Sequence, residues 1–422
     1  MESLVLTSLF AAAIVASFVL KTWLAMRQMR HVAAHRGAVP RAFVGTVSLE
    51  AHHKAADYTL ARGRFGLVSL AFGTVVLLAW TLLGGLDAVN GWVRDAVQPR
   101  FGSMAYQLAL LGAVAAIGSL VEMPLDAWNT FRIEQRFGFN RMTWKLYLID
   151  AAKGALVGAA IGLPLAALVL WIMGAAGPWW WLWAWVAWTA FQLLMLLLYP
   201  TVIAPLFNKF SPLPDASLAE RVSALMARCG FRAKGLFVMD GSKRSAHSNA
   251  YFTGLGSAKR VVFFDTLLTR LSPAEVEAVL AHELGHFKLK HVPKRMLMMF
   301  AASLAALALL GWLAQQQWFY TGLGVTPNIG GVPNDALALL LLTFSLPAFG
   351  FLVTPFAAAL SRKHEFEADA YASAQASGQD LANALVKLHE DNAGTLTPDP
   401  LYARFYYSHP PAAERLAALK TQ

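Results

Sequence analysis

The chain has 422 residues, of which 57% are hydrophobic and only 14% are charged. An ordinary soluble domain is ~45–50% apolar and ~25% charged, so this composition excludes both an average soluble enzyme and an intrinsically disordered chain. The single cysteine, Cys229, excludes an internal disulfide framework. The net charge of +10 leaves two interpretations, a nucleic-acid-binding surface or the basic cytoplasmic loops of a membrane protein.

Long apolar runs recur along the chain, and each is close to the ~20 residues that cross a bilayer core. The first has no basic stretch before it, so we expect it to remain as a span and not to be cleaved as a signal peptide. The interval 154–208 contains no charged residue, is too long for one crossing and is broken at Gly177-Pro178, so it predicts two spans. Seven spans result, at residues 4–25, 65–86, 104–125, 154–176, 179–203, 296–315 and 336–359.

Charged residues alternate between the segments that connect these spans. Four segments are rich in charged residues: the connections 26–64 and 126–148 and the regions 205–295 and 360–422. In the connection 316–335, by contrast, Asp335 is the only charged residue. Cytoplasmic loops of membrane proteins carry the excess of Lys and Arg. The pattern therefore predicts an N-terminus outside and a C-terminus inside, and it explains the positive net charge without nucleic acid.

Two water-facing regions accompany the spans. Region 205–295 contains a helical pattern at 216–229 and two short β-like runs at 235–240 and 260–265, while region 360–422 is mostly helical by periodicity. We predict a predominantly α protein in which these two regions assemble one small α+β unit. The expected domains are spans one to five at 1–204, the first part of the α+β unit at 205–295, spans six and seven at 296–359, and its second part at 360–422.

A metal-binding motif lies in the first water-facing region. Ser272, Pro273 and Glu275 are typical of a capped helix start and predict a helix over 273–290. On that helix His282 and His286 share one face, and two imidazoles at this spacing can bind one Zn²⁺. Glu283 is rotated by ~100° from His282, so it can take a proton from water without ligating the metal.

A catalytic zinc also needs a third protein ligand. His291 is one residue short of the position that would supply a third histidine in the metzincin pattern, and its helical phase points it elsewhere. Glu365 and Asp369 share a helical face after the last span, so Glu365 can complete a His₂Glu set and Asp369 can accept the second ring N–H of a ligand histidine. His364 is a weaker ligand candidate, and Glu367 is expected to be solvated.

These features, with several further segments, resemble the type 1 CAAX prenyl endopeptidase family of integral-membrane gluzincin zinc metalloproteases. The resemblance extends from the first basic loop to the C-terminus. It is carried by Glu134-Gln-Arg-Phe-Gly-Phe-Asn-Arg-Met-Thr143, Ile203-Ala-Pro-Leu-Phe-Asn-Lys-Phe210, Ser242-Lys-Arg-Ser-Ala-His-Ser-Asn-Ala-Tyr-Phe252, Glu365-Phe-Glu-Ala-Asp369 and Ser408-His-Pro-Pro-Ala-Ala-Glu-Arg-Leu416. It implies a seven-span helical barrel that encloses a chamber and is capped by a small α+β protease domain.

The resemblance also implies roles for individual residues. It places one Zn²⁺ per chain on His282, His286 and Glu365, with Glu283 as general base and Asp369 behind a ligand histidine. It implies that His409 stabilises the oxyanion and that Asn249, Ala250 and Tyr251 bind the substrate backbone as an added strand. From the residues alone, His409 is also compatible with a plain helix start, and 249–251 with a turn before a strand.

We therefore expect a membrane-embedded zinc metalloendopeptidase that resembles enzymes removing the C-terminal tripeptide of prenylated CAAX proteins. Its expected partners are a peptide or protein substrate, lipidated or not, and membrane lipid, with no nucleic acid. General proteolysis of membrane proteins or peptides is the alternative, and a channel or transporter is a remote one. The Ala- and Leu-rich composition favours a bacterial inner membrane over the endoplasmic reticulum, with the protease domain in the cytoplasm.

Overall fold

Helices dominate the computed structural model, which describes residues 1–231, 235–253 and 260–420. Seven of the described helical segments are long and apolar enough to cross a membrane, which confirms the predicted number of spans. The helices that carry them are α1 (Glu2–Ala34), α2 (Leu49–Trp80), α3 (Gly85–Trp128), α4 (Trp144–Ala175), α5 (Trp180–Leu198), α10 (His291–Leu313) and α12 (Asp335–Phe349). The chamber expected inside this bundle stays a prediction.

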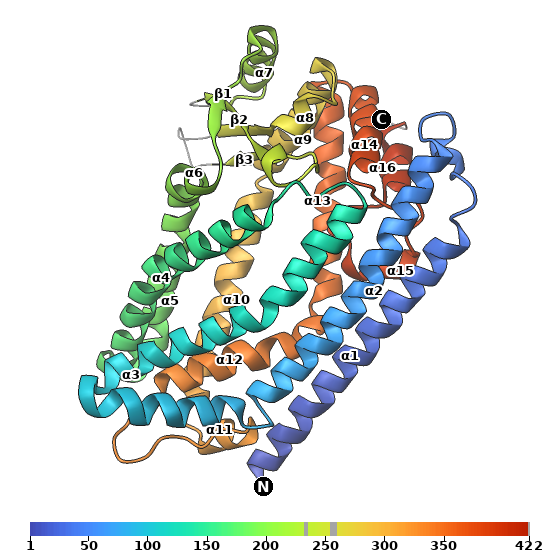
Figure 1. The fold of residues 1–422 in the computed structure, drawn as a ribbon. Helices are drawn as coiled ribbons and strands as arrows, with labels where there is room; N and C mark the ends of the chain where they lie inside the picture. Colours follow the sequence, from blue (N-terminus) through green and yellow to red (C-terminus); the bar gives the residue numbers. More distant parts are fainter. Residues whose placement is uncertain (232–234, 254–259, 421–422) are drawn as a thin grey trace.

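Shorter elements and one long helix complete the described chain. They are α6 (Ala204–Phe207), α7 (Ala216–Arg228), α8 (Asp265–Leu268), α9 (Pro273–Lys288), α11 (Gln317–Gly322), α13 (Thr354–Gln375), α14 (Gly378–Asp391), α15 (Pro400–Tyr406) and α16 (Ala412–Leu419). The strands are β1 (Phe210–Pro212), β2 (Gly235–Met239), β3 (Ala250–Thr253) and β4 (Arg260–Phe264). Figure 1 shows the sheet, α7, α9, α14 and α16 at one end of the bundle, together with the C-terminus and opposite the N-terminus.

Two span boundaries differ from the prediction. The second span was placed at 65–86, but α2 ends at Trp80 and a tight turn leads directly into α3. The turn needs glycine, because Gly84 has a φ of +77° and a Cβ on Gly85 would lie 2.4 Å from the carbonyl oxygen of Ala79. Residues 87–101, expected in a loop, are therefore helical, and the helix direction breaks at Gly102, whose φ is +81°.

The last span also differs from the prediction. It was placed as one run over 336–359, whereas α12 ends at Phe349 and α13 begins at Thr354 after a short 3₁₀ turn. Pro355 lies in the first turn of α13, where its missing N–H costs nothing. A mean hydropathy pattern cannot detect this break, because apolar residues continue across it. The consequence is that α13 is a separate helix, which extends to the end of the bundle that carries the sheet (Figure 1).

The sheet has the strand order β1-β2-β4-β3. Strands β2 and β4, which the sequence predicts, run parallel with Gly235 opposite Arg260. Strand β3 is antiparallel to β4, with Ala250 opposite Phe263. Within the described residues β3 pairs with β4 alone, so it forms an edge of the sheet.

A separate hydrophobic core lies under this sheet. It joins α7, β4, α9, α14 and α16, with fully buried side chains such as Leu225, Phe263 and Leu284. Phe43 and Val47, from the connection between α1 and α2, belong to the same core. This end of the bundle is therefore assembled from residues far apart in the chain, from the regions 205–295 and 360–422 and from the connection between α1 and α2.

Candidate metal centre and active site

Helix α9 carries the H-E-x-x-H motif, and local interactions define where it begins. The Ser272 side chain accepts a hydrogen bond from the Glu275 N–H, and the Glu275 carboxylate accepts one from the Ser272 N–H at 2.7 Å. This reciprocal pair is the capping box that the sequence predicts, and it satisfies backbone donors at the helix start. The helix register that follows places His282 and His286 on one face.

Close packing brings α13 against that face of α9. Gly285 lies at the crossing, where an added Cβ would be 3.1 Å from the Cα of Ala368 and 3.2 Å from its carbonyl oxygen. Any larger residue would push the two backbones apart. The glycine inside the motif therefore allows Glu365 on α13 to reach the two histidines on α9.

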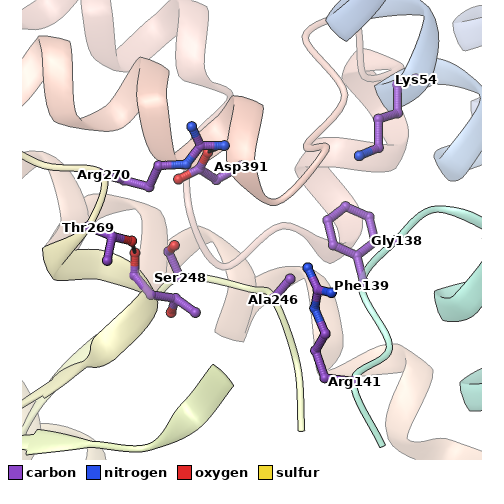
Figure 2. Close-up of a pocket in the computed structure, with 10 residues that line it drawn as sticks. Lys54, Gly138, Phe139, Arg141, Ala246, Ser248, Thr269, Arg270 and Asp391 are labelled. Carbon is purple, nitrogen blue, oxygen red and sulfur yellow. Dashed lines mark hydrogen bonds and ion pairs between the residues drawn. The ribbon is translucent and has the colours of Figure 1, made fainter. Parts of the chain in front are cut away.

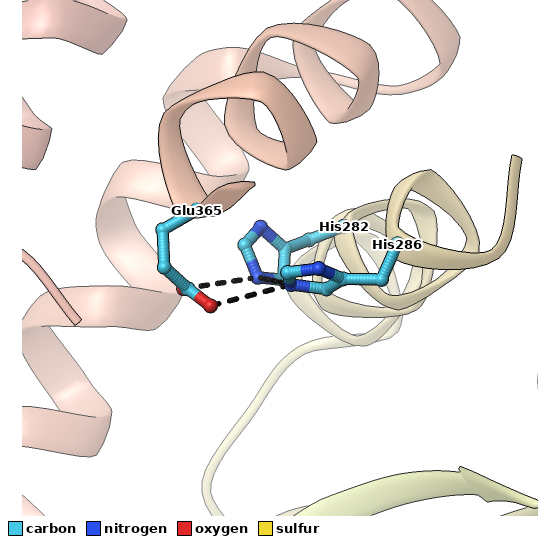
Figure 3. A group of neighbouring side chains, drawn as sticks. All are labelled: His282, His286 and Glu365. Atoms are coloured by element: carbon cyan, nitrogen blue, oxygen red, sulfur yellow. Dashed lines mark hydrogen bonds and ion pairs between the residues drawn. The ribbon is translucent and has the colours of Figure 1, made fainter. Parts of the chain in front are cut away.

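Three side chains converge at this crossing (Figure 3). The Nε2 atoms of His282 and His286 lie 3.2 Å apart. The Glu365 carboxylate faces both rings, with Oε2 at 3.4 Å from His282 Nε2 and Oε1 at 3.3 Å from His286 Nε2. Two imidazole nitrogens and a carboxylate thus point at one position, as a metal ion requires.

A buried ion pair lies behind His282. The Asp369 carboxylate is fully buried and accepts from the His282 Nδ1–H at 2.8 Å, as the sequence predicts. Arg415 from α16 donates to the same carboxylate through Nε at 2.8 Å and Nη2 at 2.5 Å, and its Nη1 lies 3.5 Å from Glu365 Oε2. Because Asp369 accepts the Nδ1 proton, the Nε2 lone pair of His282 is directed at the metal position.

The electrostatics of this cluster favour a cation. Burial by itself lowers the pKa of the His282 imidazole, but the neighbouring carboxylates of Asp369 and Glu365 reverse the effect and raise this pKa to about 9. Burial likewise opposes ionisation of Glu365, yet the two histidines hold the pKa of its carboxyl well below the ordinary value. A proton and a metal ion compete for the same nitrogen lone pair, so a site that attracts one also attracts the other.

One buried oxygen atom of Glu365 has no hydrogen-bond partner, as expected for an atom that binds a metal ion. Glu365 Oε2 is buried and accepts no hydrogen bond from any described residue, although His282 and Arg415 lie within ion-pair distance. Buried carboxylate oxygens are normally satisfied. The orphan oxygen and the facing Nε2 atoms are the donor set that a His₂Glu metal ion binds.

Two further residues that the sequence analysis singled out, Glu283 and His409, lie near the three converging side chains. Glu283 is half-buried on α9, and no hydrogen bond or ion pair to a described residue holds its carboxylate. His409, in the turn before α16, places Nε2 at 3.5 Å from Glu365 Oε1, while Ser408 Oγ lies 3.0 Å from its Nδ1. His409 thus faces the same position as the three converging side chains.

The segment 249–251 leads into the edge strand β3. Ala250 and Tyr251 pair with Phe263 and Val262 of β4, and the Asn249 carbonyl accepts from the Phe264 N–H at 3.0 Å. Strand β3 also packs against α9. Ala250 and Tyr251 therefore belong to a strand beside α9, and Asn249 directly precedes that strand.

A pocket of about 310 Å³ adjoins the loop that precedes β3 (Figure 2). Arg270 and Asp391, two of the residues that line it, form an ion pair of 2.9 Å. His282, His286 and Glu365 are not in its wall, so the pocket is separate from the metal centre. Its lining consists of Lys54, Gly138, Phe139, Arg141, Ala246, Ser248, Thr266, Thr269, Arg270 and Asp391.

Known proteins share both halves of this arrangement. Residues 28–209 match the family described as CAAX prenyl protease N-terminal, five membrane helices, and residues 212–422 match peptidase family M48. The CAAX prenyl protease 1 homolog of Arabidopsis thaliana is 34% identical over 419 residues, covering 95% of this chain and 94% of the relative. CAAX prenyl protease 1 of Saccharomyces cerevisiae is 33% identical, covering 96% and 93% respectively.

A solved structure agrees with the sequence matches. The crystal structure of S. mikatae Ste24p superposes with a TM-score of 0.91 at 31% identity, covering 98% of each chain. This chain belongs to the CAAX prenyl protease family of M48 peptidases. As a member of that family it is a multi-pass membrane metalloendopeptidase that hydrolyses peptide bonds, which confirms the predicted family, fold class and enzyme class.

Sequence reasoning missed the position of Arg415 in this family member. Its sequence neighbours carried a signal, because Ala412, Leu416 and Leu419 mark a buried face of α16 on which Arg415 also lies. A basic residue on a buried helical face needs an acidic partner. The identity of that partner, Asp369, follows only from the packing of α16 beside α13.

Sequence reasoning also missed the partners of His291. Glu367 was expected to be solvated, and its side chain is 38% exposed, but its Oε2 also lies 2.9 Å from His291 Nε2. His364 stacks on His291 with ring centroids 4.0 Å apart and stays outside the group formed by His282, His286 and Glu365. The helical phase that was assumed for His291 fails because α9 ends at Lys288 and a new helix begins at His291.

Proposed function

We propose that the metal is a single zinc ion held by His282, His286 and Glu365, and that the enzyme cleaves prenylated C-terminal CAAX sequences. The convergence of these three side chains on one position, with a buried oxygen left unpaired, carries the proposal. Two histidines and a glutamate are the established ligand set of catalytic zinc in peptidases. The names of the relatives, CAAX prenyl proteases, support the substrate class.

The chemistry assigned to each residue follows from its place. A bound zinc ion supplies Lewis-acid chemistry, which polarises the scissile carbonyl and makes water more acidic. Glu283 takes a proton from the water that attacks the carbonyl carbon, and it returns that proton to the amine when the C–N bond breaks. His409 donates a hydrogen bond to the oxyanion, and Asp369 holds His282 in the tautomer that leaves Nε2 free.

Strand β3 is the proposed substrate-binding edge. Asn249, Ala250 and Tyr251 lie at its start, beside α9, and β3 pairs with β4 alone among the described residues. An unpaired strand edge offers alternate N–H and C=O groups that an extended peptide can hydrogen-bond as an added strand. Binding in this mode would hold the scissile bond beside the H-E-x-x-H helix.

The charge distribution supports a cytoplasmic location for the protease end, the end of the bundle that carries the sheet, α7, α9, α14 and α16 (Figure 1). The connection between α1 and α2 lies at that end of the bundle in Figure 1, and it contains Arg36 and Arg41. The α2–α3 turn at the opposite end has no charge between residues 81 and 86. We assign the protease end to the cytoplasm by the positive-inside rule, in a bacterial inner membrane or otherwise the endoplasmic reticulum.

A pair of peptides tests the substrate class. Purified enzyme is incubated with a farnesylated CAAX peptide and with its unprenylated twin, and the released tripeptide is quantified by mass spectrometry. We expect the prenylated peptide to be cleaved and the twin to be cleaved at a far lower rate. Equal cleavage of both would move the function to general proteolysis of membrane peptides. Absence of any cleavage in zinc-loaded enzyme would overturn the substrate proposal.

Removal of the third ligand tests the metal set. Glu365→Ala leaves two histidines at the site and should reduce the zinc that survives dialysis from one per chain to well below half. Zinc per chain is measured by elemental analysis before and after dialysis. Glu390→Ala, a change on α14 outside the metal cluster, is the matched control and should retain wild-type zinc. Unchanged zinc in Glu365→Ala would place the third ligand elsewhere.

A further inference from the structure

A second histidine lies behind the ligand histidine His286. His291 is 1% exposed, and its Nδ1 is 3.0 Å from the Nδ1 of His286. Its Nε2 is 2.9 Å from Glu367 Oε2 on α13. The three groups form a chain in the order Glu367, His291, His286, and the far nitrogen of His286 points at the metal position.

The backbone is shaped to bring His291 to this place. Helix α9 ends at Lys288, and Lys290 adopts a left-handed conformation with a φ of +58° before α10 begins at His291. A non-glycine residue in this region is uncommon and costs energy, so the surrounding packing enforces it. His364 stacks on the His291 ring with an interplanar angle of 10°, which fixes the ring plane.

The protons in the chain can be assigned from the metal outward. A metal on His286 Nε2 needs the lone pair of that nitrogen, so the proton of the neutral ring is on Nδ1. That N–H can donate only if His291 Nδ1 is unprotonated. A neutral His291 then carries its proton on Nε2, which faces the Glu367 carboxylate. In this hydrogen-bonded series of Glu367, His291 and His286, each ring N–H therefore has one acceptor, and each acceptor has one donor.

We infer that His291 and Glu367 are positioning residues that orient His286 and increase its basicity as a metal ligand. The inference rests on the proposed metal site. Asp369 accepts the Nδ1–H of His282 directly, whereas for His286 a histidine stands between the ligand ring and the carboxylate. Such partners behind a ligand fix its tautomer and ring plane, and changing them weakens metal binding by roughly 10- to 100-fold.

The same cluster has a competing interpretation as a second metal centre. Ligand atoms of His291, His364 and Glu367 lie within 4.8 Å of one another. The ring arrangement disfavours this interpretation. A metal binds an imidazole nitrogen in the plane of the ring, and two nearly parallel stacked rings direct their lone pairs side by side and not at one ion. Both nitrogens of His291 also already face partners.

Zinc affinity tests the inference without reference to activity. His291→Phe keeps an aromatic ring against His364 but removes the acceptor for His286, and zinc affinity should fall by roughly 10- to 100-fold. His291→Asn places an amide oxygen near the Nδ1 position and should recover affinity to within about threefold of wild type. Affinities are measured in detergent by competition with a chromophoric zinc chelator. Unchanged affinity in His291→Phe overturns the inference.

Glu367→Ala provides a second test that avoids the buried histidine. Its carboxylate is more than one-third exposed, so the change does not disturb the core, and zinc affinity should fall severalfold in the same direction as for His291→Phe. Enzyme loaded with Co²⁺ should show shifted visible absorption bands in both variants, because the ligand field of His286 changes. Bands identical to those of wild type in both variants would contradict an effect transmitted through His286.

His364→Phe separates the two interpretations of the cluster. The variant preserves the stack on His291 and removes a ligand of any second metal, so zinc affinity and the Co²⁺ spectrum should match wild type. Two zinc ions in wild type and one in His364→Phe would establish a second metal centre and overturn our assignment. Failure of the proposed metal site has a different signature, since wild type would then bind no zinc at all, and failure of the proposed substrate class would leave zinc affinity unchanged.

Discussion

Glu283→Gln is expected to lower the rate of peptide cleavage by roughly 10²- to 10⁴-fold, the usual contribution of a general acid–base residue. The amide has nearly the shape of the carboxylate but cannot take a proton from water. Zinc should remain at one per chain, because Glu283 is not among the converging ligands. The measurements are kcat on a farnesylated CAAX peptide and elemental analysis of the same sample.

A surface change provides the control for this loss. Glu220 is an exposed residue on α7, and Glu220→Gln removes the same charge without touching the metal-binding helix face. Its kcat should equal that of wild type. Activity of Glu283→Gln within tenfold of wild type would remove the general-base role. A fall in zinc content would show instead that Glu283 helps to hold the metal.

Arg415→Met is expected to destabilise the fold by about 3–5 kcal/mol, the cost of breaking a buried ion pair by removing one partner. The Arg415 guanidinium makes two hydrogen bonds to Asp369, a side chain with no exposed surface, and lies near Glu365. Without it, burial opposes the charge of both carboxylates. The loss is measured as the change in unfolding free energy of chelator-treated protein in detergent.

A double-mutant cycle identifies the partner that matters. Asp369→Asn in the Arg415→Met background removes the stranded charge, so the double variant should be more stable than Arg415→Met alone. Arg415→Lys keeps the charge but not the two-pronged geometry, and its loss should be intermediate. Added zinc should reduce the loss in Arg415→Met, because a cation beside Glu365 replaces part of the missing charge. A loss below about 1 kcal/mol would contradict the buried-pair argument.

Local sequence determined much of the catalytic helix. Ser272, Pro273 and Glu275 specify the start of α9, and the four-residue spacing of His282 and His286 then follows from helical geometry. The same spacing places Glu365 and Asp369 on one face of α13. The number of spans was also predictable, because each must supply about 20 apolar residues whatever its neighbours are.

Other features depended on contacts between distant segments. The break between α12 and α13 interrupts continuous apolar sequence, so hydropathy alone could not reveal it. Gly285 appears in the sequence only as a small residue within the motif. Its role emerges from the crossing of α9 and α13, where Ala368 leaves no room for a side chain.

The residues behind the metal ligands also separate what the sequence determined from what the tertiary structure decided. The sequence determined that His282, His286 and Glu365 were the metal-binding candidates and that Asp369 could accept from a histidine. Only the tertiary structure decided that Arg415 faces Asp369 and that His291 links His286 to Glu367. Helical periodicity acts over a few residues, whereas these pairs are formed by helices whose relative positions depend on the packing of the whole protease end.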